Sequence, residues 1–194
     1  MIHDKNMIAF NKEFRSDNII LRPLLKEDFQ EMYQLTKDPQ MWTYFTSDLS
    51  DKDELKNWID SAIKDYSRLA LTIIDQKTKR IIGSTSIGNI SSSDKRAEIG
   101  WSWIGKDYQG KGYNALVKGL MLRYLFDDCD FERVEFKTDV LNIPARKALK
   151  KMGLVEEGIL RSHTLMIRNR RRDTIFYGVL KKEWEKMRSQ NRWY

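Results

Sequence analysis

The stretch from residue 96 to residue 126 constrains this chain most, because three segments of different character follow one another in it. In the first segment Ile99, Trp101 and Trp103 alternate with smaller or polar residues, which predicts a strand with these three side chains on one face. The last segment, from Tyr113 on, has apolar residues at helical spacing. The loop between them holds three glycines: Gly105, Gly110 and Gly112. A strand, a glycine-rich loop and a helix in this order present free backbone N–H groups and the positive end of a helix to an anion.

The loop alone does not identify that anion. It lacks the Gly-Lys-Ser/Thr ending of a Walker A loop and the third glycine of a dinucleotide fingerprint, so a structural turn is an open alternative. From Gln109, however, the order Gln-Gly-Lys-Gly-Tyr-Asn resembles the Gln/Arg-x-x-Gly-x-Gly/Ala pyrophosphate loop of the GNAT acetyltransferases. The resemblance implies that the loop and the following helix hold the diphosphate of acetyl-coenzyme A. Asn114 departs from the pattern, and its side chain is expected either to contact a phosphate or to cap the helix.

A second motif lies further along, where a proline in the first turn and a glycine at the end predict a helix over 142–154. Four of its residues resemble the GNAT pattern Asn-x-x-Ala/Ser followed by Gly-Phe: Asn142, Ala145, Gly153 and Leu154. The runs at 21–23 (Leu-Arg-Pro) and 156–161 look like the RimJ/RimL branch, which acetylates the N-termini of ribosomal proteins. The resemblance therefore covers roughly residues 18–180. Leu149 stands where many family members have a tyrosine thought to protonate the departing thiolate.

The rest of the chain alternates strand-like runs with amphipathic helical segments. Strands are expected over 18–23, 69–75, 80–90, 96–104, 133–140, 155–167 and 173–180. The aromatic run 40–49 is expected to fill core or line a pocket. No repeat or linker interrupts the chain, so residues 1–194 are expected to be a single domain, with an irregular lead-in over 1–17 and a charged helix or tail over 181–194. The resemblance implies the mixed α/β GNAT fold: a twisted, mostly antiparallel sheet of about seven strands, splayed between the fourth and fifth and flanked by four to five helices.

Composition narrows the function classes. No apolar run reaches the length of a membrane-spanning helix, and the start of the sequence lacks the apolar core of a signal peptide. With a single cysteine, Cys129, these features predict a cytoplasmic protein without disulfides. The flanking aspartates disfavour a thiolate, so Cys129 is not expected to be a nucleophile. The net charge of +7 suits coenzyme A, ribosomal RNA around a protein substrate, or a generally basic surface. No zinc-ligand spacing is present, and no metal is expected.

The resemblance implies direct transfer of acetyl from the thioester to a primary amine. An alkylamine is cationic at neutral pH, so a base must first remove a proton, directly or through water. Glu98 lies in the central strand, where the family often places a carboxylate for this task; a glutamate that merely pairs with a neighbouring Lys or Arg is the alternative. His163 is a second candidate base because an imidazole titrates near neutral pH, with a structural role as its alternative.

Acetyl-coenzyme A is the expected co-substrate, held by residues from three places in the sequence. A backbone N–H near the end of the central strand would hold the oxyanion, the loop would cradle the diphosphate, and basic residues would reach the other phosphates. The candidates are Trp103, Ile104, Gln109, Gly110, Lys111, Gly112, Tyr113, Asn114, Asn142, Ala145, Arg146 and Lys150.

Two other functions stay open at this stage. The chain could be a non-catalytic module that binds coenzyme A or a peptide, or a basic protein associated with RNA or the ribosome, although no RNP-type motif is present. The sequence does not choose the acceptor among a protein N-terminus, a polyamine, an aminoglycoside and another small amine. It does not indicate the oligomeric state either.

Overall fold

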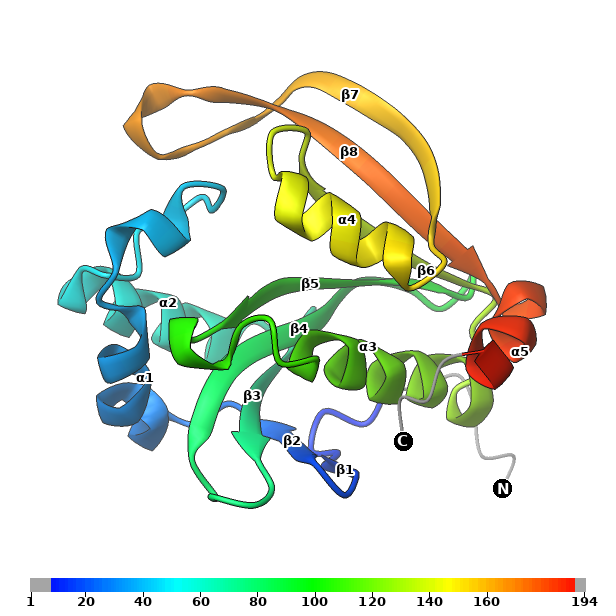
Figure 1. The fold of residues 1–194 in the computed structure, drawn as a ribbon, viewed down its shortest axis with the longest axis horizontal. Coiled ribbons are helices and arrows are strands. Elements are labelled where there is room, and N and C mark those ends of the chain that lie inside the picture. Colours follow the sequence, from blue (N-terminus) through cyan, green and yellow to red (C-terminus); the bar gives the residue numbers. More distant parts are fainter. Residues whose placement is uncertain (1–7, 191–194) are drawn as a thin grey trace.

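A computed structural model describes residues 8–190, which form one open sheet with helices on both faces (Figure 1). In spatial order the strands are β1-β2-β3-β4-β5-β6-β8-β7. Their bounds are β1 Phe14–Arg15, β2 Ile19–Pro23, β3 Leu69–Asp75, β4 Ile81–Ser91, β5 Arg96–Ile104, β6 Arg133–Asp139, β7 Val155–Leu165 and β8 Arg171–Leu180. All neighbours pair antiparallel except β5 and β6, which pair parallel. The mixed, mostly antiparallel sheet is therefore confirmed.

Five α-helices lie in the described part of the chain: α1 Phe29–Thr36, α2 Lys52–Lys64, α3 Tyr113–Arg123, α4 Ile143–Lys151 and α5 Lys181–Gln190. Their buried residues define two apolar cores, one on each face of the sheet. Residues of α3, α4 and α5 contribute to one core, and residues of α1 and α2 to the other. On β3, Leu69, Leu71 and Ile73 face the first core while Ala70 faces the second. Burial of both faces explains why this strand is almost continuously apolar.

The β5 strand contains a bulge in the middle of the motif region. Ser84 pairs with Trp103 and Ser86 with Gly100, so β5 has one residue more than β4 between these pairs. Trp101 takes up the extra residue with a φ of 50°, which is rare for a bulky side chain. The bulge reverses the alternation: Ile99 belongs to the core under α3, whereas Trp103 belongs to the core under α1 and α2. The prediction that Ile99, Trp101 and Trp103 share one face is therefore wrong.

Strands β5 and β6 pair only at their beginnings. The last paired residues are Glu98 and Glu135, after which β5 runs on to Ile104 and β6 to Asp139 without pairing to each other. This opening is the predicted splay. It falls between the fifth and sixth strands rather than the fourth and fifth, because the short strand β1 precedes the seven that the sequence indicated.

Both ends of the described chain are more ordered than the sequence indicated. Phe14 and Arg15 of the expected irregular lead-in pair with β2, and Phe14 is buried. The charged segment at the other end is helix α5, whose buried Trp184 packs on Phe126. Residues 1–7 and 191–194 of the two expected segments lie outside the described residues. Within 8–190, no helix combines the length and apolar character needed to cross a membrane.

Candidate active site

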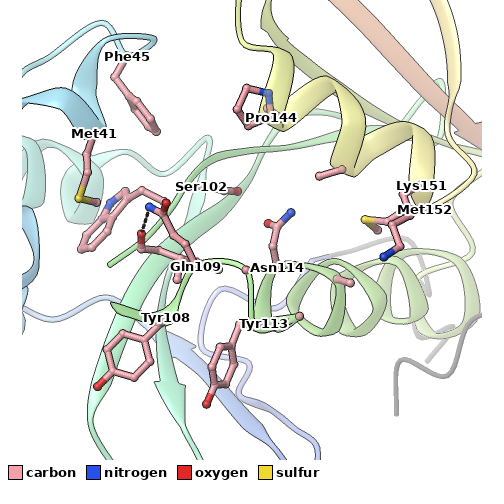
Figure 2. Close-up of a pocket in the computed structure, with 17 residues that line it drawn as sticks. Met41, Phe45, Ser102, Tyr108, Gln109, Tyr113, Asn114, Pro144, Lys151 and Met152 are labelled. Atoms are coloured by element: carbon pink, nitrogen blue, oxygen red, sulfur yellow. Dashed lines mark hydrogen bonds between the residues drawn. The ribbon is translucent and has the colours of Figure 1, made fainter. Parts of the chain in front are cut away.

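Two adjoining cavities lie at this part of the fold, and the larger one is between the end of β5, the start of α3 and the helix α4 (Figure 2). Its volume is about 550 Å³, in the range of small-molecule sites. Ser102 and Ile104 contribute from β5, and the opposite wall is built from residues of α4. The complete lining is Met41, Phe45, Ser102, Trp103, Ile104, Tyr108, Gln109, Gly110, Gly112, Tyr113, Asn114, Ala115, Pro144, Ala145, Ala148, Lys151 and Met152.

The glycine loop presents free backbone N–H groups at one end of this cavity. Gly110 has a φ of 73° and Gly112 a φ of 87°, in the left-handed region that favours glycine. A Cβ at either position would meet no atom within 4 Å, so the backbone faces open space. Among the described residues, no hydrogen bond uses the N–H groups of residues 110–114. Free N–H groups at a helix N-terminus are suited to bind an anion, and the family resemblance implies the diphosphate of coenzyme A.

Gln109 and Asn114 line this cavity from the loop and from the first turn of α3. Gln109 lines the cavity, but its Nε2 donates to the carbonyl of Ile104 at 2.8 Å and so ties the loop to the end of β5 (Figure 2). Asn114 does not cap α3, since the N-cap residue is Gly112. The Asn114 side chain instead extends from the start of α3 into the cavity (Figure 2).

Most of the expected cofactor residues line this cavity, but three cations do not. Lys111 lies over the ring of Tyr108, 5.8 Å from its centroid. Arg146 donates to the carbonyl of Val140 at 2.9 Å, and Lys150 forms an ion pair of 2.8 Å with Glu156. Their side chains are thus engaged by nearby protein groups. The basic residue that does line the cavity is Lys151, which the motif comparison missed.

A smaller cavity of about 230 Å³ adjoins the larger one at the opening between β5 and β6. Both cavities are lined by Phe45, Ser102, Asn114 and Ala145. The smaller cavity has the more charged lining: Glu98, Lys118, Lys137 and Arg172. Phe45 belongs to the aromatic run 40–49, which was expected to fill core or line a pocket. The run does both, because Phe45 lines the two cavities whereas Trp42 is fully buried in the core. The larger cavity and the smaller, more charged one therefore meet at the splay.

Asn142 lines the smaller cavity and fixes the start of α4. Its Oδ1 accepts from the N–H of Ala145 at 3.2 Å, as an N-cap residue does, and its Nδ2 donates to Thr138 Oγ1 at 3.2 Å. The side chain thus joins the end of β6 to the helix that forms one wall of the larger cavity.

The two candidate bases lie in different surroundings. Glu98 lines the smaller cavity and is buried; it accepts from Asn89 Nδ2 at 2.6 Å and pairs with Lys137 Nζ at 2.8 Å. His163 lies on β7, its Nδ1 3.1 Å from Thr174 Oγ1, and lines neither cavity. Cys129 also lines neither, and burial raises the pKa of its thiol. Of these groups the structure brings only Glu98 to the site.

Lys118 is a site residue that the sequence analysis did not single out. It lies on α3, is 4% exposed and lines the smaller cavity. Its Nζ donates to the hydroxyls of Ser102 and Thr85. Burial lowers the pKa of this ammonium to about 7. The sequence contains one indication of this role, because Lys118 lies inside the apolar run of α3, where a solvated charge is not expected.

The indole of Trp103 is a second feature that only the structure reveals. Its Nε1 is buried and has no hydrogen-bond partner among residues 8–190. Trp103 also lines the larger cavity, so this donor belongs to a residue of that site.

Comparison with known proteins agrees with this geometry. Residues 18–155 match the acetyltransferase (GNAT) domain. The "Uncharacterized N-acetyltransferase p20" of Bacillus licheniformis is 25% identical over 87% of this chain and 96% of the relative. The "Putative ribosomal N-acetyltransferase YdaF" of Bacillus subtilis is 26% identical over 88% of this chain and 95% of the relative. A crystal structure of a GCN5-related N-acetyltransferase from Brucella melitensis superposes with a TM-score of 0.87 at 25% identity, covering 92% of this chain and 83% of that one.

Proposed function

The chain belongs to the GNAT family of acetyltransferases, and from that premise we propose that it transfers the acetyl group of acetyl-coenzyme A to a primary amine in the smaller cavity. The observation that carries the proposal is the meeting of the two cavities at Ser102 and Asn114, beside the glycine loop. One cavity has a helix N-terminus for a diphosphate, and the other opens on the same stretch of β5. A thioester and an amine held in this way react without a covalent enzyme intermediate.

We assign the following roles to individual residues, supported by their positions in the two cavities. The N–H groups of residues 110–114 would hold the diphosphate, and a backbone N–H near Trp103 or Ile104 would stabilise the oxyanion. Asn142 and Ala145 would position α4 along the pantetheine arm. Glu98 is the only carboxylate among the described residues lining the smaller cavity, so it is our candidate to take the proton of the amine through water.

The reaction balances with these groups. The amine nitrogen attacks the thioester carbonyl, the C–N bond forms, and the C–S bond breaks to release a thiolate. Two protons leave the nitrogen of the cationic amine. The first, lost before the attack, is taken by Glu98 through water and released to solvent, and the second, lost once the C–N bond has formed, passes through water to the thiolate. Leu149 is buried at the position of the usual family tyrosine and carries no proton to donate. No general acid is therefore assigned to this position.

An acceptor screen tests the proposal. Acetyl-coenzyme A is mixed with peptide N-termini, polyamines, aminoglycosides and amino acids, and released thiol and acetylated product are both measured. The name of the Bacillus subtilis relative makes ribosomal-protein N-termini one set of peptides to include. Acetylated product with at least one amine supports the proposal. Binding of acetyl-coenzyme A without product for any amine would instead favour the non-catalytic module.

A further inference from the structure

The smaller cavity is lined by two buried cations that form no ion pair with a carboxylate among residues 8–190. Lys118 is 4% exposed and Arg172 is 9% exposed, and both line the cavity. Among residues 8–190 the Lys118 ammonium donates only to hydroxyl groups, and burial is the cause that lowers its pKa. Arg172 donates to Thr174 Oγ1 at 3.0 Å and Thr164 Oγ1 at 3.4 Å.

The acidic residues near Arg172 are already paired with other cations. Asp139 pairs with Arg170, and Glu98 pairs with Lys137 at 2.8 Å. The Glu98–Lys137 pair cancels within the cavity lining, which leaves Lys118 and Arg172 as its uncompensated charges. A buried charge without a counter-ion is strongly unfavourable, because burial removes its hydration without replacing it. Lys118 and Arg172 therefore destabilise the fold unless a ligand supplies negative charge beside them.

The phosphates of coenzyme A are not that negative charge. Gly110 and Gly112 of the loop line only the larger cavity, whereas Lys118 and Arg172 line only the smaller one. The diphosphate site and the two cations thus lie in different cavities, which meet at Ser102 and Asn114.

We infer that the acceptor is a primary amine on a molecule that carries a carboxylate, and that Lys118 and Arg172 recognise this carboxylate. The inference rests on the proposed function and names its substrate class. The guanidinium of Arg172 offers several donors to a carboxylate, and the nearby ammonium of Lys118 adds a point charge. The same two cations repel a polyamine or an aminoglycoside, whose further amines are cationic. A free amino dicarboxylate and the acidic N-terminus of a peptide share the required chemistry.

The protonation of Lys118 predicts that binding of the acceptor depends on pH. Because its pKa is about 7 in the free protein, the ammonium is only partly charged near neutral pH. A carboxylate bound beside it favours the charged form, so binding near pH 7 takes up protons. The other charged or titratable groups lining the cavity are Glu98, Lys137, Arg172 and Tyr44. Affinity for the anionic acceptor is therefore expected to fall as pH rises above about 7.

The test compares acceptors that differ only in charge. A tripeptide amide with two side-chain carboxylates is measured beside its asparagine–glutamine counterpart, together with free aspartate and spermidine. Turnover with acetyl-coenzyme A gives kcat/KM, and titration calorimetry of the coenzyme A-loaded protein gives affinity without turnover. Calorimetry in buffers of different ionisation enthalpy counts the protons taken up. Free aspartate and the acidic peptide distinguish the two sources of the carboxylate.

Three variants connect the preference to the two cations. Lys118→Met and Arg172→Gln each remove one charge from the cavity. Arg171→Gln is the matched control, because Arg171 is the neighbouring β8 residue, is exposed and bonds to Ser162 outside the cavity. We expect the wild type to prefer a carboxylate-bearing acceptor roughly ten- to a hundredfold, the effect of a charge-assisted hydrogen bond. The preference should shrink toward unity in the two cavity variants and persist in the control.

The outcomes separate the inference from the proposed function. Equal or better binding and turnover of the neutral peptide or spermidine overturns the inference but leaves an acetyltransferase. An absence of product with every amine counts against the proposed function, and calorimetry then decides the inference by itself. Tighter binding of the carboxylate-bearing ligands, lost in Arg172→Gln, supports it. Equal binding of charged and neutral ligands overturns it.

Discussion

Glu98 on β5 and Lys137 on β6 form an ion pair, with 2.8 Å between Oε2 and Nζ, at the place where the two strands stop pairing. The amide of Asn89 donates to the same carboxylate oxygen from the other side at 2.6 Å. Lys137 also lies over the ring of Trp101, 5.8 Å from its centroid, so the pair extends to the bulge in β5. One contact thus links the candidate base, the splay and the bulge.

Replacing Glu98 tests its role as the base. Glu98→Gln keeps shape and hydrogen bonding and removes the charge, so kcat at pH 7 should fall by about a hundredfold to ten-thousandfold. The loss should shrink as pH rises, because the amine then loses its proton unaided. Steady-state kinetics between pH 7 and pH 10 measures both effects. Glu135→Gln is the control, since Glu135 is opposite Glu98 in the parallel pair and lines neither cavity. A Glu98 variant within about threefold of wild type at pH 7 would show that water or another group takes the proton.

Replacing Gly112 tests the phosphate loop. Valine is strained at the φ of 87°, and its side chain would enter the open space that the glycine backbone faces. Gly112→Val should therefore abolish binding of acetyl-coenzyme A, measured by calorimetry, while leaving the fold largely intact by circular dichroism. Gly153→Val places a similar strain at a φ of 94° at the end of α4, outside both cavities. It should lower stability without a comparable loss of affinity. Unchanged affinity in Gly112→Val would move the diphosphate elsewhere.

Replacing Asn142 tests how α4 is positioned. Asn142→Ala removes the N-cap of α4 and the bond to Thr138, which costs about 1 kcal/mol of helix stability. Because α4 lines the cavity proposed for acetyl-coenzyme A, KM for this substrate should rise more than kcat changes. Asn142→Asp keeps the cap and should recover part of the loss. A collapse of kcat at constant KM would instead place Asn142 in the chemical step.

The order of elements and the glycine loop could be predicted from the sequence, because they depend on local signals. Gly110 and Gly112 show positive φ, and the alternation of β6 and the proline-glycine pair around α4 mark real elements. The family resemblance added the splay, which no local pattern contains.

The bulge and the second cavity could not be predicted in the same way. One inserted residue at Trp101 reverses the faces of β5, and single-strand alternation carries no information about the partner β4. Arg172 looks like one of several exposed arginines near a turn, and only the pairing of β8 with β6 brings it to the cavity. Lys150 and Arg146 were expected at the cofactor, but the structure pairs them with Glu156 and with the carbonyl of Val140. These partners become close only in the folded chain.

The Leu-Arg-Pro run of the RimJ/RimL resemblance leads to a stability prediction at Asp28. Burial alone would raise the pKa of Asp28, but hydrogen bonds from Arg22 (2.8 Å), Thr72 (2.6 Å) and the N–H of Leu25 (3.0 Å) outweigh it and lower the pKa. Asp28→Asn should lower the free energy of unfolding at pH 7 by about 2–4 kcal/mol, because Arg22 loses its partner.

The pH dependence of the Asp28 contribution has a definite sign. A carboxylate with a lowered pKa stabilises the fold fully above its unfolded value of about 3.9, and the contribution is lost as pH falls through the folded pKa. Urea unfolding at several pH values should therefore show the difference between wild type and Asp28→Asn shrinking below about pH 4. A difference that stays constant down to pH 2 would contradict this account.

We expect Lys118 to lower the free energy of unfolding at neutral pH, and this effect should weaken as pH rises. Its pKa is about 7 in the folded chain and about 10.4 in the unfolded one, so between these values the unfolded state binds more protons. The contribution of Lys118 to the free energy of unfolding thus rises with pH across this window, by about 3–5 kcal/mol at full extent. Lys118→Met removes the titrating group and keeps most of the volume, so the variant should be more stable than wild type at pH 7. The difference should shrink toward pH 10, as chemical denaturation of both proteins would show.

If Lys118→Met is no more stable than wild type at pH 7, the Ser102 and Thr85 hydroxyls already compensate the charge. In that case the cavity needs no anionic ligand to balance it.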